Sequence, residues 1–354
     1  MTDTSVVVAA PEVGFWRKLW RISTPYFRSE DWKVAWTLLI AVLVLVLGGI
    51  YIDVLINDWN RDFYNCLQQK DLTPIPVSVF GHELFVVNRF LYLIGKFTVL
   101  ALIWIVLTVY AIYLRQILQI RWRRWMTFSL SNKWLAHRAY YRLQLLSYGT
   151  DNPEQRIQDD IDSFTSDSLR LSLGTISNVV SLVTFIGILW GLSGPLSFDF
   201  SGIHFDIPGY MVWAAVIYAL GGTIATFFVG RPLVKANFDL QRFGADFRYR
   251  MTRIRENAES IALYGGERQE ADGLVVGFSR IWTNWWRVMI LTKRLNWLTS
   301  FYSQLAVVFP YLMAAPRYFS SAIDLGTLFQ IASAFRQVKD ALSWFIDAFQ
   351  ALAS

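Results

Sequence analysis

Apolar residues along this chain gather into long runs, and strongly polar segments separate them. The runs 35–51 and 97–114 contain no Lys, Arg, Asp or Glu. Each has about the length that an α-helix needs to cross a hydrocarbon layer roughly 30 Å thick. The pattern predicts an all-α membrane protein with six transmembrane helices, at residues 34–56, 90–114, 172–195, 209–230, 297–316 and 327–348.

Positive charge is distributed unevenly between the predicted spans. Segment 115–170 carries nine Lys and Arg residues and segment 231–294 carries twelve, whereas 196–208 carries none. Because Lys and Arg in loops favour the cytoplasmic side of a membrane, we expect these two segments and both termini to be cytoplasmic. The net charge of +6 follows from this topology, so no nucleic-acid partner is needed to explain it.

The first 33 residues are polar and lack the short apolar core of a cleaved signal peptide. The stretch 15–21, FWRKLWR, alternates aromatic and basic residues. This pattern favours a cytoplasmic interfacial helix within 1–33, lying under anionic lipid headgroups before the first span. A disordered basic tail is the alternative.

The two basic segments are long for structureless loops, and both are rich in helix formers. We expect the neighbouring spans to continue as helices and turn back, so that arms of about 30 residues project about 45 Å. In the first segment, Asn152 suits a helix N-cap, Pro153 the first helical position and Gln155 the third. In the second, Gly265 and Gly266 suit the left-handed turn that ends a helix.

Both predicted turns resemble motifs of one family of ABC-transporter membrane domains. Residues 151–157, DNPEQRI, are similar to the first intracellular loop of the peroxisomal fatty-acyl (ABCD) type and its bacterial relatives. Residues 256–267, which end in ESIALYGGE, resemble the EAA-like motif of that family. Residues 315–319, APRYF, resemble the bacterial branch, which is related to SbmA/BacA peptide transporters.

The resemblance implies the type-1 ABC exporter (type IV) membrane-domain fold over 34–350, with long cytoplasmic helical extensions. It also implies a homodimer in the lipid bilayer, whose cytoplasmic turns rest on ATP-binding domains and transmit their closure to the spans. The coupling residues would then be Asn152, Pro153, Glu154, Gln155, Arg156, Glu256, Glu259, Gly265, Gly266 and Glu267. Helix capping alone is the alternative role for these residues.

No phosphate-binding loop of the form Gly-x-x-x-x-Gly-Lys-Ser/Thr occurs in the sequence. We therefore expect that this chain hydrolyses no ATP by itself and holds no cofactor. ATP and Mg²⁺ would bind a nucleotide-binding domain, either in cis after 351–354, which would begin a linker, or in trans. A transporter of the SbmA/BacA kind, which uses the proton gradient and needs no such domain, is the remaining alternative.

Polar residues of the last predicted span recur at three- and four-residue intervals, which places them on one helical face. They are Gln330, Ser333, Gln337, Asp340 and Trp344. Because ionised groups that face lipid are costly, the stripe favours a water-filled cavity that these residues line. The alternative is that its lower half already lies in cytoplasmic water.

Other kinds of site have little support. The single cysteine, Cys66, permits no intrachain disulfide, and the three histidines show no metal-ligand spacing. We therefore predict no metal site and no catalytic residue. No segment resembles the selectivity filter of a channel.

These patterns together favour the membrane-spanning permease domain of an ATP-driven ABC transporter, in a bacterial inner membrane. The alternative is a proton-coupled peptide importer, for which only Asp53, Asp340 and Asp347 are candidate carboxylates within the spans. The substrate and the direction of transport do not follow from the sequence.

Overall fold

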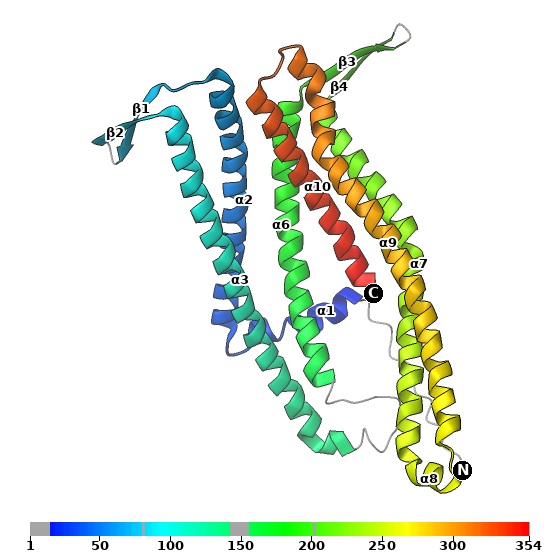
Figure 1. Cartoon of the computed structure of the whole chain (residues 1–354). Coiled ribbons are helices and arrows are strands. Elements are labelled where there is room, and N and C mark those ends of the chain that lie inside the picture. Colours follow the sequence, from blue (N-terminus) through cyan, green and yellow to red (C-terminus); the bar gives the residue numbers. More distant parts are fainter. Residues whose placement is uncertain (1–14, 80–81, 142–155, 201–202, 354) are drawn as a thin grey trace. The chain divides into compact units, whose positions relative to one another are not determined.

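The computed structural model describes residues 15–79, 82–141, 156–200 and 203–353 (Figure 1). The chain divides into two units, Met1–Ser181 and Leu182–Ser354. Their boundary lies inside one long helix, α6 (Ile161–Ser193).

The first unit is dominated by two long helices, α2 (Trp32–Gln69) and α3 (Arg89–Leu135), which pack side by side. A hairpin of β1 (Pro74–Val79) and β2 (His82–Asn88) connects them. The shorter elements are α1 (Phe15–Ser23), η1 (Tyr26–Arg28), η2 (Ala136–Arg138) and a π-helical turn, η3 (Arg156–Asp160).

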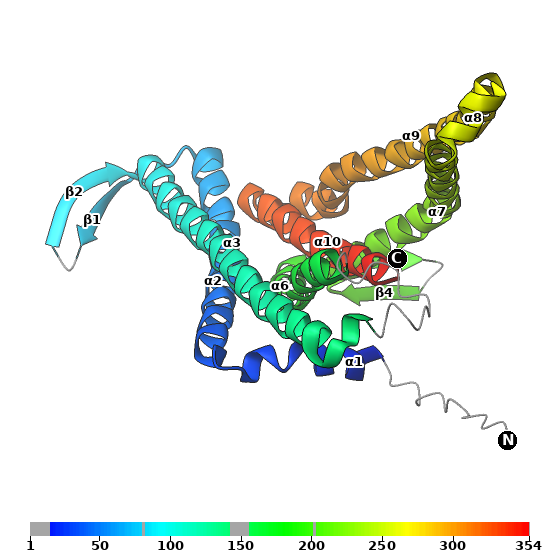
Figure 2. The same cartoon turned by 90° about the horizontal axis from the view of Figure 1, so that it is seen from below.

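The second unit begins within α6 and continues into a hairpin of β3 (Pro195–Phe200) and β4 (Ile203–Pro208). Two long helices, α7 (Tyr210–Glu256) and α9 (Glu267–Phe319), lie side by side and are joined by the short helix α8 (Ala258–Tyr264). Helix α10 (Leu325–Ala353) packs against both long helices near the hairpin end of the unit (Figures 1 and 2).

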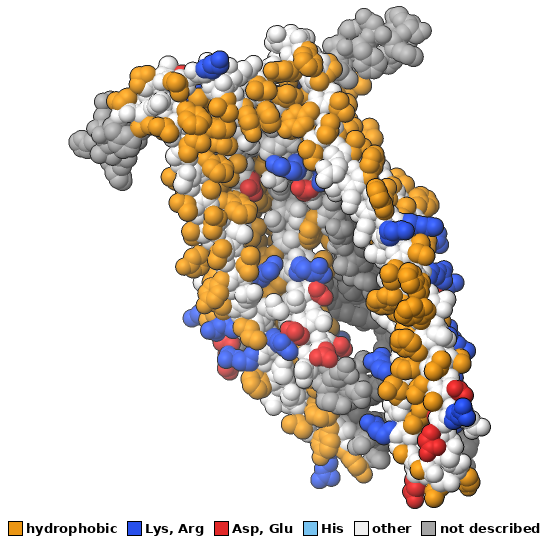
Figure 3. All heavy atoms as spheres, viewed as in Figure 1, with side chains coloured by type: hydrophobic (Ala, Val, Ile, Leu, Met, Phe, Trp, Pro, Cys, Tyr) orange, Lys and Arg blue, Asp and Glu red, His pale blue; other side chains and the backbone are white. Residues whose placement is uncertain are grey.

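Five helices are long and apolar enough to cross a membrane: α2, α3, α6, α7 and α9. They match the first five predicted spans, except that 172–195 ends two residues beyond α6 and 209–230 begins one residue before α7. Hydrophobic side chains cover much of the visible surface of α2 and α3 (Figure 3). Helix α10 contains the sixth predicted span but is not among these five, and the charged residues Arg336, Lys339 and Asp340 lie near its middle. The chain is thus a multi-pass helical membrane protein.

The two β-hairpins were not predicted, because hydropathy and charge identify 57–88 and 196–208 only as connections between predicted spans. Two-stranded hairpins tolerate proline at their edges, and Pro74 and Pro195 each stand at the start of a strand. Asp71 closes the base of the first hairpin by accepting hydrogen bonds from the Thr73 amide (3.0 Å) and from Nη1 of Arg89 (2.6 Å). The bonds with Thr73 and Arg89 hold the pKa of Asp71 below its usual value.

Aromatic contacts hold α2 and α3 together toward the first hairpin. The indole N–H of Trp59 donates to the carbonyl oxygen of Leu93 at 2.8 Å. The Trp59 ring stacks on Phe63, with ring centroids 4.6 Å apart, and contacts Phe97 at 4.7 Å. A side chain that bonds a backbone carbonyl within an aromatic cluster fixes the register of the two helices.

Candidate functional site

The predicted second turn is a compact tip in which α7 ends, α8 forms and α9 begins. Asn257 ends α7: its backbone N–H and its side-chain Nδ2 both donate to the Arg253 carbonyl, at 3.0 and 2.8 Å. Gly265 adopts the left-handed conformation, with φ of 62°, and the Gly266 N–H donates to the Ile261 carbonyl at 3.0 Å. This bond between residues five apart is the Schellman arrangement, so the paired glycines end α8 as the sequence predicts.

The side chains of the tip point into solvent. Glu256, Glu259 and Glu267 are all exposed, and no ion pair to them occurs in the described part of the chain. Leu263 is 77% exposed and Tyr264 is 90% exposed. Large apolar side chains that project next to free carboxylates are typical of a contact surface.

Leu263 and Tyr264 were missed as candidate residues, although they lie inside the quoted motif. Apolar residues within a predicted helix are normally expected on the face that packs against neighbouring helices. The short α8 has no inner face at its last turn, because the chain reverses directly after Tyr264. The signal that could have identified them is an apolar pair immediately before two glycines.

The first predicted turn lies largely outside the described residues. This applies to Asn152, Pro153, Glu154 and Gln155, and Arg156 is the first residue of η3. The described residues that follow this turn contact α3. Nη1 of Arg123 lies 2.9 Å from a carboxylate oxygen of Asp162, and Nη2 of Arg123 donates to the Gln158 carbonyl.

The polar stripe of α10 is divided between two environments. Gln330 is 2% exposed, whereas the side chain of Asp340 is 56% exposed. Ser333, Gln337 and Trp344 lie between these extremes. Asp340 forms an ion pair with Lys339 at 2.8 Å. The stripe therefore runs from a packed end near Gln330 to an open end near Asp340.

The opposite face of α10 is apolar and tightly packed. Its fully buried residues are Ile331, Ala334, Phe335 and Val338. This face packs against α7 and α9, which agrees with the helical periodicity that separates it from the polar stripe.

An aromatic joint fastens α7, α9 and α10 to one another; we define it as Tyr218, Gly222, Tyr302, Phe309 and Phe335. Tyr218 and Tyr302 stack with ring centroids 4.5 Å apart. Each tyrosine hydroxyl donates to the backbone carbonyl of the other tyrosine. A Cβ atom on Gly222 would lie 2.3 Å from the Tyr302 ring, so only glycine fits there.

A second fixed point, the Arg317 clasp, joins the ends of α6 and α9. Nη1 of Arg317 donates to the carbonyl oxygens of Leu192 and Ser193. Gly194 has φ of 58°, and a Cβ atom there would meet the guanidinium at 2.7 Å. A cation at a helix C-terminus stabilises the exposed carbonyls, which gives the APRYF motif a structural role. Sequence spacing could not reveal it, because the partners are more than 120 residues apart.

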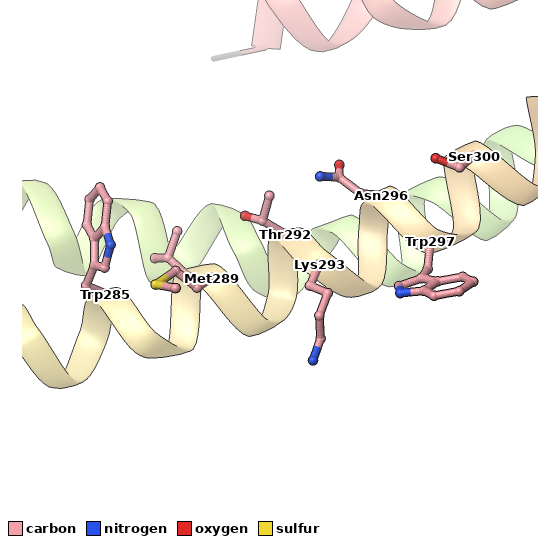
Figure 4. A pocket seen from close by; sticks show the side chains of 8 residues that line it. Trp285, Met289, Thr292, Lys293, Asn296, Trp297 and Ser300 are labelled. Carbon is pink, nitrogen blue, oxygen red and sulfur yellow. The ribbon is translucent and has the colours of Figure 1, made fainter.

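An open surface hollow along α9 was also not predicted. Its lining residues all come from this helix: Trp285, Val288, Met289, Thr292, Lys293, Asn296, Trp297 and Ser300. Figure 4 shows Thr292, Asn296 and Ser300 projecting on the same side of α9, while Lys293 projects on the other side. Thr292, Asn296 and Ser300 thus present hydrogen-bonding groups on one side of α9, whereas Trp297 projects on the same side as Lys293.

The carboxylate candidates differ in their surroundings. Asp53 on α2 is half-buried and forms a hydrogen bond with the side chain of Trp104 on α3. Asp340 is exposed, and the side chain of Asp347 lies outside the described residues. Among the residues that the structure describes, no three His, Cys, Asp or Glu side chains gather as a metal site would require.

The sequence is similar to that of known membrane proteins. The family model "ABC transporter transmembrane region 2" matches residues 22–319. The inner membrane ABC transporter ATP-binding protein YddA of Escherichia coli is 36% identical over 333 residues, which cover 93% of this chain and 56% of the relative. An uncharacterized ABC transporter ATP-binding protein of Haemophilus influenzae is 35% identical over 289 residues, covering 82% and 46%.

A plant relative extends the comparison to the D family. ABC transporter D family member 2, chloroplastic, of Arabidopsis thaliana is 34% identical over 344 residues, covering 96% of this chain and 44% of the relative. The chain spans about half the length of the curated relatives it matches. The resemblance to the ABCD type and its bacterial relatives is confirmed, and this chain belongs to the ABC transporter transmembrane region 2 family.

Proposed function

We propose that this chain is the membrane-spanning permease domain of an ATP-driven ABC transporter that works as a homodimer in a bacterial inner membrane. Six spans, with α10 as the sixth, would form the pathway, and both termini would lie in the cytoplasm. ATP and Mg²⁺ would bind nucleotide-binding domains, in cis or in trans. The E. coli relative carries both "inner membrane" and "ATP-binding" in its name, which supports this assignment.

The observation that carries the proposal is the tip between α7 and α9. It combines a capped turn at Gly265 and Gly266 with the exposed Glu256, Glu259 and Glu267. The exposed Leu263 and Tyr264 add an apolar contact at the same place. A rigid turn that presents carboxylates and apolar side chains is suited to docking on a second domain, and the two long helices then carry its movement toward the spans.

The pathway would be lined by the open part of the α10 stripe. Ser333, Gln337, Asp340 and Trp344 are the accessible members, and Gln330 closes the stripe at its packed end. The α9 hollow with Thr292, Asn296 and Ser300 adds hydrogen-bonding groups at a similar helical spacing. This mixture of indole, hydroxyl and carboxylate groups supports a bulky, partly polar substrate.

The test is conducted on the assembled transporter in sealed vesicles, with Ser333→Cys as a reporter in a Cys66→Ser background. We expect Mg²⁺ and ATP to change the rate at which a membrane-impermeant maleimide labels this cysteine. Combining the reporter with Glu259→Ala and Gly265→Val should abolish that change while ATP hydrolysis continues. Gly244→Ala is the matched control, because a Cβ there has open space and no left-handed strain.

The second candidate function is a proton-coupled peptide importer. It is supported by Asp53, which is half-buried and forms a hydrogen bond with Trp104. The same vesicles separate the two candidates. A labelling change that follows an imposed proton gradient, persists without ATP and is lost in Asp53→Asn would replace our proposal with the importer.

A further inference from the structure

Exposed basic side chains gather where the chain enters the long helices of the first unit. They are Arg17, Arg21, Arg28, Lys33 and Arg124, and we call them the elbow cations. Arg17 and Arg21 lie in α1, Arg28 ends η1, Lys33 lies in the first turn of α2, and Arg124 comes from α3. An ion pair of 3.7 Å between Arg124 and Asp31 joins the two segments.

A buried tyrosine fixes this stretch to α3. Tyr26 in η1 is fully buried, and its ring stacks on that of Trp122 with centroids 5.9 Å apart and planes 13° apart. The Ser29 hydroxyl donates to the Tyr26 carbonyl at 2.7 Å and tightens the turn toward α2. The elbow cations of η1 and α2 are therefore held in a defined place beside α3.

The hydroxyl of Tyr26 has no hydrogen-bond partner among the described residues, although it is buried. The carboxylate of Asp31 and the guanidinium groups of Arg121 and Arg124 lie within electrostatic range of it. Burial raises the pKa of this hydroxyl, so it stays a neutral donor. Buried polar groups in native proteins normally have a partner. Because this hydroxyl is shielded from solvent, only the exposed arginine and lysine side chains around it are open to an anion.

Aromatic side chains surround the elbow cations on the outside. Trp20 is 68% exposed, and Trp32 and Trp36 are also exposed. The Lys33 ammonium lies 5.8 Å from the centre of the Trp32 ring. Tryptophan with exposed cations beside it prefers the headgroup level of a bilayer. The next exposed residues along α2, from Ile40 onward, are apolar and suit the hydrocarbon layer.

We infer that the elbow cations and the exposed tryptophans form a binding site for the headgroups of anionic phospholipids in the leaflet that α2 enters. The guanidinium groups would bind the phosphate, and the indole rings would pack against the glycerol and the first acyl carbons. A soluble phosphate would use only the charges, so the exposed tryptophans favour a lipid as the occupant.

The experiment measures the thermal unfolding midpoint of the purified transporter by tryptophan fluorescence. The protein is placed in nanodiscs of phosphatidylcholine alone or of phosphatidylcholine mixed with phosphatidylglycerol. We expect phosphatidylglycerol to raise the midpoint by about 5 °C. The variant Arg21→Gln/Arg28→Gln/Arg124→Gln should lose this rise.

Two further variants keep the result interpretable. Arg242→Gln/Arg248→Gln/Arg255→Gln removes three exposed arginines of α7 and should keep the full rise. Arg21→Gln/Arg28→Gln leaves the pair of Arg124 and Asp31 intact and should lose part of the rise, even if the triple elbow variant does not fold. An equal rise in all variants would overturn the inference. Stabilisation in phosphatidylcholine nanodiscs by inorganic phosphate as large as that by phosphatidylglycerol would also overturn it, because a lipid would then not be required.

Discussion

The pair of helices α7 and α9 is built differently at its two ends. Toward the β3–β4 hairpin, the aromatic joint and the Arg317 clasp connect the helices through buried rings and hydrogen bonds to backbone carbonyls. Toward the tip, residues 231–256 of α7 and 267–294 of α9 form what we call the arm. Many of its apolar side chains are exposed, among them Val234, Phe238, Val275 and Trp282.

The arm is joined by one ring contact, between Phe247 and Phe278 with centroids 5.9 Å apart, and by polar contacts. Asn284 is buried and donates from Nδ2 to the Ala236 carbonyl at 2.8 Å. Arg250 donates to the Gly273 carbonyl at 3.0 Å, and Arg287 lies 4.0 Å from Asp239. The hairpin end is thus fixed by buried contacts. In the arm the two helices lie side by side, and their outer surface is exposed and can contact a partner. This division suits a part that receives a movement at its tip and transmits it to the spans.

The largest effect is expected from Gly222→Ala. The new methyl group would lie 2.3 Å from the Tyr302 ring, which stacking and a hydrogen bond hold in place. Overpacking at such a site costs about 3 kcal/mol, so the thermal unfolding midpoint should fall clearly. Gly221→Ala is the matched control, because a Cβ there has nothing within 4 Å, and it should leave the midpoint unchanged or higher. Equal effects at the two glycines would disprove a tight joint.

Arg317→Ala should have the next largest effect. It removes the donors to the Leu192 and Ser193 carbonyls, and a hydrogen bond from a charged group contributes about 2 kcal/mol. The check is the same unfolding midpoint, with Arg280→Ala on the arm as the control, since Arg280 is exposed. If both variants lose the same stability, the clasp is not what fixes this end.

Tyr302→Phe tests the joint more finely, because it keeps the ring stack and removes only the hydroxyl. The bond to the Tyr218 carbonyl is lost, which should cost about 1 kcal/mol. Tyr249→Phe on the exposed surface of the arm should cost nothing measurable. A loss from Tyr249→Phe as large as that from Tyr302→Phe would mean that the arm is fastened as firmly as the joint.

The smallest effect is expected on the arm itself, from Arg287→Gln. The pair with Asp239 spans 4.0 Å, and the arginine side chain is 53% exposed. Exposed pairs typically contribute about 0.2–1 kcal/mol, and salt weakens them further. The unfolding midpoint should hardly change at low salt and not at all at high salt. A loss comparable to that of Arg317→Ala would contradict the contrast between the two ends.

Hydropathy predicted the long helices well, because a long apolar run without charged residues is typical of a membrane-spanning helix. The turn at Gly265 was also predictable, since a left-handed residue after an apolar helical stretch favours glycine. Both are local properties of the chain. They cover the five long helices and the second predicted turn, but they do not specify which faces meet.

The remaining features depend on contacts between distant segments. Tyr218 and Tyr302 look like two ordinary aromatic residues within apolar spans, and only the packing of α7 on α9 makes them a reciprocal pair. The α10 stripe shows the same limit: periodicity placed Gln330 and Asp340 on one face, yet packing buries the first and leaves the second open. Periodicity assigns a face to a residue, and tertiary packing decides how much of that face is covered.

The most direct test of the proposed ATP-driven coupling is the distance between the two arms of the proposed homodimer. A spin label at Ala245→Cys, an exposed position on α7, in a Cys66→Ser background reports it by pulsed electron resonance. We predict one interspin distance without nucleotide and a shorter one with ATP and Mg²⁺, and no shortening when Glu259→Ala and Gly265→Val are added. A distance that ATP leaves unchanged, or one that shortens equally in the tip variant, would contradict coupling through this tip.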